Sequence, residues 1–150
     1  MESAVETHRR LRLHDLLSVC RRLCQQACGI IRDVQSEREG TQGSHASLRA
    51  ELKDPLDPRS YMTVADTRAQ QHIVAGLRAT FGETLDIVGE EEDQDGTDAA
   101  TAVFCASDSP DIGSGYIVPL ELQELEYHDV CVFIDPLDGT REFVEGRLEV

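Results

Sequence analysis

Basic residues are scarce in this sequence of 150 residues. It contains 14 lysines and arginines against 29 aspartates and glutamates, which gives a formal net charge of -15. A surface of that sign repels phosphate backbones, which argues against sequence-independent binding to a nucleic-acid polymer. A small phosphorylated substrate remains compatible with it, because bound cations invert the local charge at a site.

Long hydrophobic runs are absent as well. No stretch is long and apolar enough for a membrane span, and the start of the chain lacks the basic-then-apolar pattern of a signal peptide. The five cysteines are odd in number, and reduced thiols are the simplest account of them. We therefore expect a soluble, cytoplasmic protein that does not bind membranes.

Common catalytic and zinc-binding patterns are also missing. The five histidines show no zinc-ligand spacing, and no Cys-His or Ser-His-Asp arrangement can be placed. Cys20, Cys24 and Cys28 recur at four-residue steps. Three thiols along one helix do not surround a tetrahedral ion, so we predict that all three lie in or near the core.

Helical periodicity dominates the first part of the chain. Apolar residues recur at three- and four-residue steps from about Val5 to Gln35, which predicts one long amphipathic helix. The polar stretch from Ser36 to Ser60 contains two glycines and two prolines, and it is expected to be a loop with a short helical piece around residues 46–52. The predicted buried stripe of the helix comprises Leu13, Leu16, Leu17, Cys20, Leu23, Cys24, Ala27, Ile30, Ile31 and Val34.

A second helix is predicted to begin at Thr63. The Thr63 hydroxyl is suited to cap the helix N-terminus, and Gly82 is suited to end the helix shortly after Thr80. Its predicted buried stripe comprises Ala65, Ala69, Ile73, Val74 and Leu77.

A short strand, Leu85–Val88, is predicted to follow this helix and to lead into Glu90. A helix of about fifteen residues rises about 22 Å, and a strand of about six residues returns about 20 Å. Asp66, in the first turn of the helix, and Glu90 are therefore expected at the same end of the layer. The acidic segment 91–115 misses the spacing of a calcium loop and is expected to be solvated, with a short helix over residues 116–128.

The stretch from Asp135 to Thr140, Asp-Pro-Leu-Asp-Gly-Thr, is the most informative in the sequence. It follows the apolar run Val130–Ile134, whose β-branched content predicts a buried strand. Pro136 directs the chain out of the strand, Gly139 permits close approach to a ligand, and Thr140 is suited to cap a following helix. Two carboxylates at a strand end beside a helix N-terminus can hold a metal ion and a phosphate together.

Other interpretations of this motif stay open from the residues alone. A bare Asp-Pro-x-Asp-Gly is also typical of a polar turn at a strand end. A near-copy, Asp54–Asp57, lies in the polar loop without a preceding strand or a Gly-Thr pair, and we interpret it as unrelated to the site. If the strand before Asp135 lies parallel to the strand before Glu90, four acidic side chains converge.

Three segments together resemble the lithium-sensitive, magnesium-dependent phosphatase superfamily that includes inositol monophosphatase. They are Met62–Asp66, Ile87–Glu91 and Ile134–Thr140, in the order and with the rough spacing of that family. Arg141–Phe143, Arg-Glu-Phe, looks like the 3'(2'),5'-bisphosphate nucleotidase branch, since inositol monophosphatases more often show Thr-Asn-Phe there. Ala27–Arg32 also looks like the family's first-helix pattern.

The resemblance implies a role for each matching residue. Asp66 and Thr140 would form the pair that activates the attacking water, and the backbone amides of Gly139 and Thr140 would hold the substrate phosphate. Two or three Mg²⁺ ions are implied as cofactors. Metal ligation is implied for Glu90, Asp135, Leu137 (through its carbonyl) and Asp138.

The fold implied by the resemblance is α+β, a layered αβαβα sandwich of the inositol monophosphatase type. In that family a Trp-Asp motif further along the chain supplies another metal-ligating aspartate, and this sequence contains no tryptophan. We therefore expect residues 1–150 to be the N-terminal, metal-binding half of such a fold, with the C-terminal half missing.

Three functions remain as alternatives. The first is Mg²⁺-dependent hydrolysis of the 3'-phosphate of adenosine 3',5'-bisphosphate to AMP and phosphate. The second keeps the mechanism and takes an inositol mono- or polyphosphate as the substrate. The third is a non-catalytic remnant that binds only cations or a partner.

Overall fold

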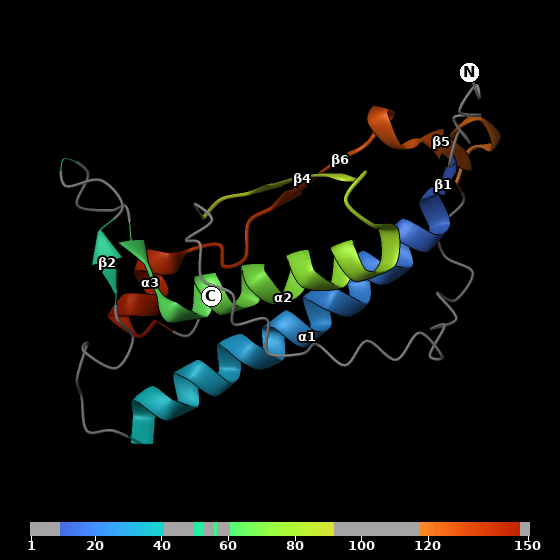
Figure 1. Ribbon diagram of the computed structural model, residues 1–150. Helices are drawn as coiled ribbons and strands as arrows, with labels where there is room; N and C mark the ends of the chain where they lie inside the picture. Colours follow the sequence, from blue (N-terminus) through green and yellow to red (C-terminus); the bar gives the residue numbers. More distant parts are fainter. Residues whose placement is uncertain (1–9, 41–49, 53–55, 57–60, 92–117, 148–150) are drawn as a thin grey trace.

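The computed structural model of the chain describes residues 10–40, 50–52, 56, 61–91 and 118–147. Two long helices, α1 (Leu13–Gly40) and α2 (Val64–Phe81), run side by side as one layer of a mixed α/β structure (Figure 1). The other described elements are β1 (Arg10–Arg12), β2 (Glu51–Leu52), β3 (Tyr61–Met62), β4 (Asp86–Gly89), η2 (Leu120–Leu122), β5 (Glu124–Glu126), η3 (Tyr127–Asp129), β6 (Cys131–Ile134) and α3 (Thr140–Glu145).

The described strands form three two-stranded sheets. β4 and β6 pair in parallel, with Asp86 opposite Cys131 and Gly89 opposite Ile134, and they lie along α2 (Figure 1). β1 and β5 pair antiparallel near the start of α1, while β2 and β3 pair antiparallel beside α3. Because β4 and β6 run in the same direction, the residues that follow them meet at one edge. This parallel arrangement is the one on which the expected convergence of the acidic side chains depends.

The main core forms where α1 meets α2 and the β4–β6 sheet. Leu23 of α1 and Leu77 of α2 are fully buried in it. A Cβ at Gly76 would collide with the side chain of Leu23, so the absence of a side chain there lets the two helices approach closely. The buried members of this cluster are Leu11, Leu16, Val19, Leu23, Ala27, Ala69, Ile73, Leu77, Phe81, Leu85, Tyr127 and Ile134.

The predicted limits of the second helix are confirmed. Thr63 has extended backbone angles and its hydroxyl accepts the Ala65 N–H at 3.2 Å, which satisfies one of the unpaired amides of the first turn. Gly82, with φ 79°, ends the helix and donates its N–H to the Arg78 carbonyl at 2.9 Å. Local capping chemistry therefore sets both ends of α2.

A second, smaller cluster fixes the turn after β6 to both long helices. Val34 of α1, Ala65 of α2, Leu137 of the turn and Phe143 of α3 are all buried against one another. The turn that carries the acidic motif is therefore anchored by its apolar residue, and the carboxylates of Asp135 and Asp138 on either side of it are exposed.

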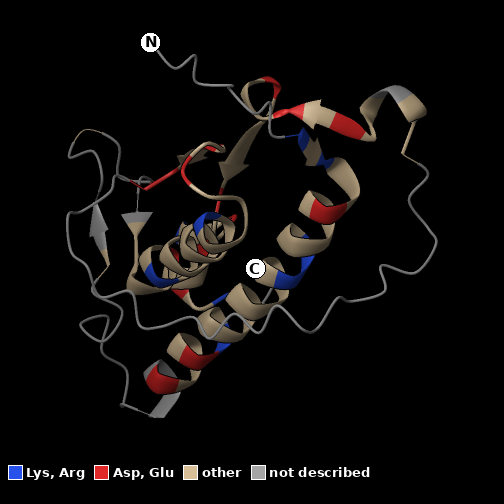
Figure 2. Ribbon diagram, turned by 45° about the vertical axis from the view of Figure 1, so that its right-hand side comes forward, with Lys and Arg blue, Asp and Glu red and all other residues tan. Residues whose placement is uncertain are grey.

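The predicted start of the first helix is wrong. Arg10–Arg12 forms strand β1, in which the buried Leu11 alternates with two exposed arginines, and α1 begins only at Leu13. The alternation favours a strand with one buried face, and ion pairs from Arg10 to Glu124 (3.4 Å) and to Glu126 (3.6 Å) accompany its pairing with β5. Figure 2 shows the basic β1 beside the acidic β5.

The predicted burial of the three helix cysteines is also largely wrong. Cys24 and Cys28 are exposed, and only Cys20 is half-buried against the core, where burial, followed by the nearby Cys24, raises the pKa of its thiol. Leu17 is 39% exposed, whereas Val19, which the predicted stripe omitted, is buried. The face of α1 that packs on α2 is rotated relative to the predicted stripe, because the position of the partner helix decides which residues are covered.

Two further local expectations need correction. Glu51–Leu52, placed in a short helix by the sequence, forms strand β2; residues 46–49 lie outside the described residues. Residues 118–129 contain two 3-10 turns with strand β5 between them, where one short helix was expected. In both places pairing with another strand, β3 for β2 and β1 for β5, overrides a weak local preference.

Strand β6 is not buried on both faces as its apolar sequence predicted. Ile134 faces the helices, but Phe133 is 77% exposed on the opposite face, beside the partly exposed Val88 of β4. In the described part of the chain, helices cover only one face of this sheet. Within the same residues, no helix combines the length and the apolar character needed to cross a membrane.

Candidate active site

Asp66 is a fully buried carboxylate at the first turn of α2. Its Oδ2 accepts the Thr63 N–H at 2.8 Å and the Thr63 hydroxyl at 2.6 Å, which completes a capping box with the Thr63 hydroxyl and the Ala65 amide. A buried carboxylate without such donors would be strongly destabilising. The cap therefore holds the side chain in one orientation, with Oδ1 directed away from the box.

Thr140 meets that second oxygen. Its hydroxyl oxygen lies 3.0 Å from Oδ1 of Asp66 and 3.0 Å from the Leu137 carbonyl oxygen. The hydroxyl has one proton, so it donates to one of these acceptors at a time or shares the proton between them. The structure thus brings together the two residues that the sequence analysis paired, across a large separation in the chain.

The prediction that Thr140 caps α3 is wrong. Thr140 is the first helical residue, and Gly139 stands at the N-cap position without a side-chain cap. Gly139 has φ 79° and ψ 38°, a left-handed conformation that is unfavourable for residues with a Cβ. That turn aims the Thr140 hydroxyl at Asp66 instead of at the helix N-terminus.

Glu90 and Asp135 lie side by side at the edge where β4 and β6 end. The Glu90 N–H donates to the Ile134 carbonyl at 2.9 Å, which continues the parallel ladder by one residue beyond β4. The pKa of the Asp135 carboxyl is raised, first by desolvation and then by a hydrogen bond with Glu90 and by the charges of Glu90 and Asp138. A hydrogen bond from the Leu137 backbone opposes that rise. Negative charge is therefore crowded at this edge.

These groups suit a hard divalent cation. Carboxylates and a carbonyl are oxygen donors of the kind that Mg²⁺ takes, and a bound cation would offset the repulsion from Glu90 and Asp138 that, after desolvation, raises the pKa of Asp135. Within the described ranges, however, no three Asp, Glu, His or Cys side chains are grouped so that they could hold an ion. Asp135 and Asp138 are exposed, whereas the Leu137 carbonyl accepts the Thr140 hydroxyl.

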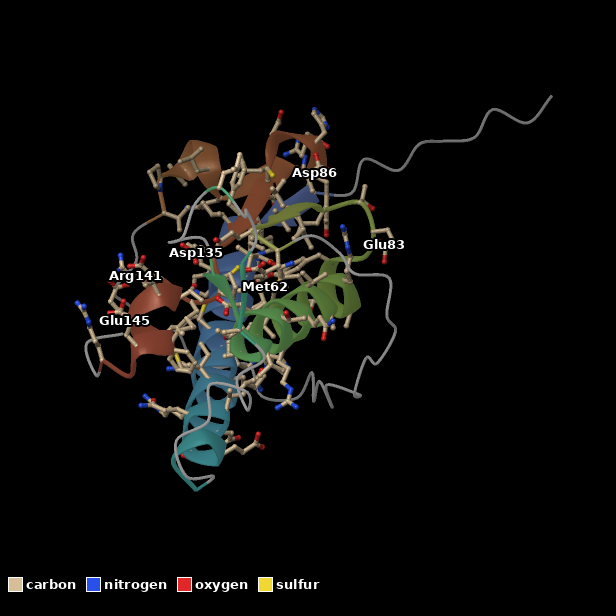
Figure 3. The ribbon with its side chains drawn as sticks, turned by 90° about the vertical axis from the view of Figure 1, so that its left-hand side faces the viewer. Met62, Glu83, Asp86, Asp135, Arg141 and Glu145 are labelled. Carbon is tan, nitrogen blue, oxygen red and sulfur yellow. The ribbon has the colours of Figure 1, made fainter. Side chains whose placement is uncertain are left out.

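Helix α3 and the residues just after it carry charged side chains that pair with one another. Arg141 Nε lies 2.8 Å from Glu145 Oε1, and Arg147 Nη2 lies 2.7 Å from Glu145 Oε2. The hydrogen bond from Arg141 is the largest of the effects that lower the pKa of Glu145. Figure 3 shows Asp135 on the same side of the molecule as Arg141 and Glu145.

Gln70 belongs to the site as well, although its position was not predicted from the sequence. This residue is 5% exposed and lies one turn after Asp66 in α2, where its side-chain amide makes two hydrogen bonds to the backbone of Glu91. A polar residue at a helix position that shares a face with Asp66 and Ile73 was a usable signal. The near-copy Asp54–Asp57 lies outside the described residues except for Leu56, which is 93% exposed.

Comparison with known proteins relates most of the chain to one family. The model of the family described as "Inositol monophosphatase family" matches residues 13–149. The chain is 37% identical, over 139 residues, to "3'(2'),5'-bisphosphate nucleotidase 1" of Dictyostelium discoideum; the match covers 92% of this chain and 40% of that protein. The chain thus spans well under half the length of this curated relative. No solved structure matches the chain.

Proposed function

The chain belongs to the inositol monophosphatase family, a family of Mg²⁺-dependent phosphatases, and on that premise we propose that it contributes the metal-binding half of a phosphomonoesterase. The observation that carries the proposal is the pairing of Thr140 with Asp66 beside the crowded carboxylates Glu90 and Asp135. The proposed complete fold is a layered αβαβα sandwich, of which residues 1–150 form the N-terminal half.

We assign the metal to the edge where β4 and β6 end. The proposed ligands are Glu90, Asp135, the Leu137 carbonyl and Asp138, for two or three Mg²⁺ ions. Exposed carboxylates such as Asp135 and Asp138 have room to change rotamer, and such changes are needed to close a ligand set around an ion. Bound Mg²⁺ would supply a more acidic attacking water and would offset charge on the phosphoryl oxygens.

The Asp66–Thr140 pair is proposed to handle the proton. Thr140 would receive a proton from the attacking water while its own hydroxyl proton passes to Oδ1 of Asp66, 3.0 Å away. Oδ2 of Asp66 is already occupied by two donors from Thr63, which leaves Oδ1 as the acceptor. The capping box therefore orients the base as well as starting the helix.

The substrate phosphate is proposed to lie at the backbone amides of Gly139 and Thr140. The Phe143 N–H donates to the Gly139 carbonyl at 3.0 Å, which is the first hydrogen bond of α3. The amides of Gly139 and Thr140 precede that bond, so the helix itself provides them with no acceptor. An anion there is next to the proposed metal ligands, so a phosphate and a metal ion could share oxygens.

Adenosine 3',5'-bisphosphate is the proposed substrate, and hydrolysis would release AMP and phosphate. Support comes from the Arg-Glu-Phe sequence at Arg141–Phe143 and from the similarity to 3'(2'),5'-bisphosphate nucleotidase 1 of Dictyostelium discoideum. An inositol phosphate is the second candidate substrate, because the family that matches the chain takes its name from inositol monophosphatase.

The test is phosphate release by the protein from adenosine 3',5'-bisphosphate and from an inositol monophosphate, each in Mg²⁺ and in EDTA. We expect phosphate release that depends on Mg²⁺, with adenosine 3',5'-bisphosphate as the better of the two substrates. A preference for the inositol phosphate would replace the substrate and keep the mechanism. Release from neither, with cation binding by the chain intact, would leave the non-catalytic alternative.

A further inference from the structure

Gln70 joins helix α2 to the chain that leaves strand β4. Its Nε2 donates to the Glu91 carbonyl at 2.8 Å, and its Oε1 accepts the Glu91 N–H at 3.0 Å. A side-chain amide that bonds both groups of one residue imitates the pairing of a neighbouring strand. The side chain is 5% exposed, so this exchange of hydrogen bonds takes place away from water.

Gly89 makes this contact possible. A Cβ on Gly89 would stand 2.5 Å from Cδ, 2.5 Å from Nε2 and 2.6 Å from Oε1 of Gln70. A flexible side chain could ordinarily move aside, but here the movement would break both hydrogen bonds to Glu91. The amide of Gln70 therefore occupies the space that a side chain at position 89 would need.

Hydrogen bonds hold the backbone on both sides of the Glu90 side chain. On one side the Glu90 N–H is bound to the Ile134 carbonyl, directly before Asp135, and on the other side both backbone groups of Glu91 are bound to Gln70. The backbone at Glu90 is thus fixed to β6 at the residue before Asp135, and to α2 through the two hydrogen bonds of Glu91.

We propose that Gln70, seated against Gly89, is a positioning residue that holds Glu90 where its carboxylate can share a cation with Asp135. This inference rests on the proposed function, which makes Glu90 and Asp135 metal ligands. Gln70 touches neither the ion nor the substrate, and it acts through the backbone of Glu91. Residues that orient ligands in this way affect affinity for the metal when they are replaced.

The test measures two properties of the whole chain with Mn²⁺ as the probe ion. Amide hydrogen exchange at Glu91, without metal, reports the hydrogen bond itself, and Gln70→Leu is expected to accelerate it by about tenfold. Mn²⁺ titration reports positioning, and the same variant is expected to bind about tenfold more weakly. Ile73→Val, which trims a buried side chain in the same helix, is the control for lost stability and should leave the Mn²⁺ affinity unchanged.

Gly89→Ala disturbs the same contact from strand β4, because its Cβ would displace the Gln70 amide. It replaces Gln70→Leu in the test if that variant does not fold. It should also weaken Mn²⁺ binding, and in a Gln70→Ala background it should weaken binding no further, because the contact is already gone. Full additivity of the two changes would overturn the proposal, as would faster exchange at Glu91 with unchanged affinity.

Asp135→Asn separates this inference from the proposed function. If Asp135→Asn abolishes Mn²⁺ binding while Gln70→Leu and Gly89→Ala leave it unchanged, the positioning role is wrong and the proposed site stands. If the unsubstituted chain does not bind Mn²⁺, or if Asp135→Asn binds it equally well, the proposed site fails and the positioning role fails with it.

Discussion

The hydroxyl oxygen of Thr140 lies 3.0 Å from Oδ1 of Asp66, although 74 positions separate the two residues in the chain. Asp66 is fully buried, and its other carboxylate oxygen is held by Thr63. Thr140 is held as well, because Gly139 turns the chain through a left-handed conformation just before α3. Two independently fixed elements therefore present one donor and one acceptor to each other, which is the geometry expected of a proton-transfer pair.

Thr140→Val should remove proton transfer with little effect on metal binding. Valine has nearly the same shape and no hydroxyl, so kcat for phosphate release is expected to fall by about 10²–10³-fold. Thr140→Ser restores the hydroxyl and should recover most of the rate. Steady-state kinetics with Mn²⁺ titration in parallel would check this, and a rate for Thr140→Val equal to that of the unsubstituted protein would contradict the assigned role.

Thr63→Val should destabilise the fold by removing the N-cap of α2. The hydroxyl accepts from Ala65 and donates to Asp66, and loss of such a cap costs about 1–2 kcal/mol. Thr80→Val is a matched control, because the Thr80 hydroxyl donates to the Gly76 carbonyl within the same helix and caps no terminus. Its change should stay within about 0.5 kcal/mol. Urea unfolding followed by circular dichroism measures both, and equal losses would show that the cap adds nothing.

Asp135→Asn should stabilise the metal-free protein near neutral pH. The folded state raises the pKa of Asp135, so it binds the proton more tightly than the unfolded chain does. The contribution of this carboxyl to stability is therefore complete below its unfolded pKa of about 3.9 and is lost as the pH rises through the higher folded value. Asparagine does not carry the charge and escapes that loss.

Thermal unfolding in EDTA checks this sign. The melting temperature of Asp135→Asn should exceed that of the unsubstituted protein at pH 7, and the difference should shrink as the pH falls and vanish below the unfolded pKa of about 3.9. Asp86→Asn, at the other end of β4, is the positional control (Figure 3). A variant that is less stable than the unsubstituted protein at pH 7 in EDTA would show that the carboxylates are not crowded.

The two faces of β6 should respond differently to substitution. Phe133 is 77% exposed and Ile134 is buried in the main core. Phe133→Ser is expected to change the free energy of unfolding by no more than about 0.5 kcal/mol, whereas Ile134→Ala should cost about 2–5 kcal/mol. Chemical denaturation gives both values. A large loss for Phe133→Ser would mean that this side chain is covered.

Structural features that depend on neighbouring residues could be predicted from the sequence. Thr63, Asp66 and Gly82 define the ends of α2 through capping chemistry that operates over a single turn, and all three are where the pattern placed them. Chain lengths place Asp66 and Glu90 at the same end of the layer, but they leave the parallel pairing of β4 with β6 open, and the structure supplies it. The family resemblance is confirmed by the match over residues 13–149.

Features that depend on a distant partner could not be predicted. Cys24 belongs to the predicted apolar stripe of α1 and Cys28 was expected in or near the core, but the position of α2 leaves both exposed. Arg10–Arg12 continues the helical pattern of the sequence, yet it forms a strand because its backbone pairs with β5. Gln70 shows the same limit within the site, since its role depends on hydrogen bonds to Glu91, 21 residues away.

The central claim is that the carboxylates around Asp135 form a metal-dependent phosphatase site, and the near-copy of the motif provides its sharpest test. Phosphate release from adenosine 3',5'-bisphosphate should be measured against Mg²⁺ concentration for the unsubstituted protein, Asp135→Asn and Asp54→Asn. Asp135→Asn should lose at least about 10²-fold in kcat/KM together with its Mg²⁺ affinity, while Asp54→Asn should match the unsubstituted protein. Equal losses in the two variants, or no loss in Asp135→Asn, would contradict the assignment.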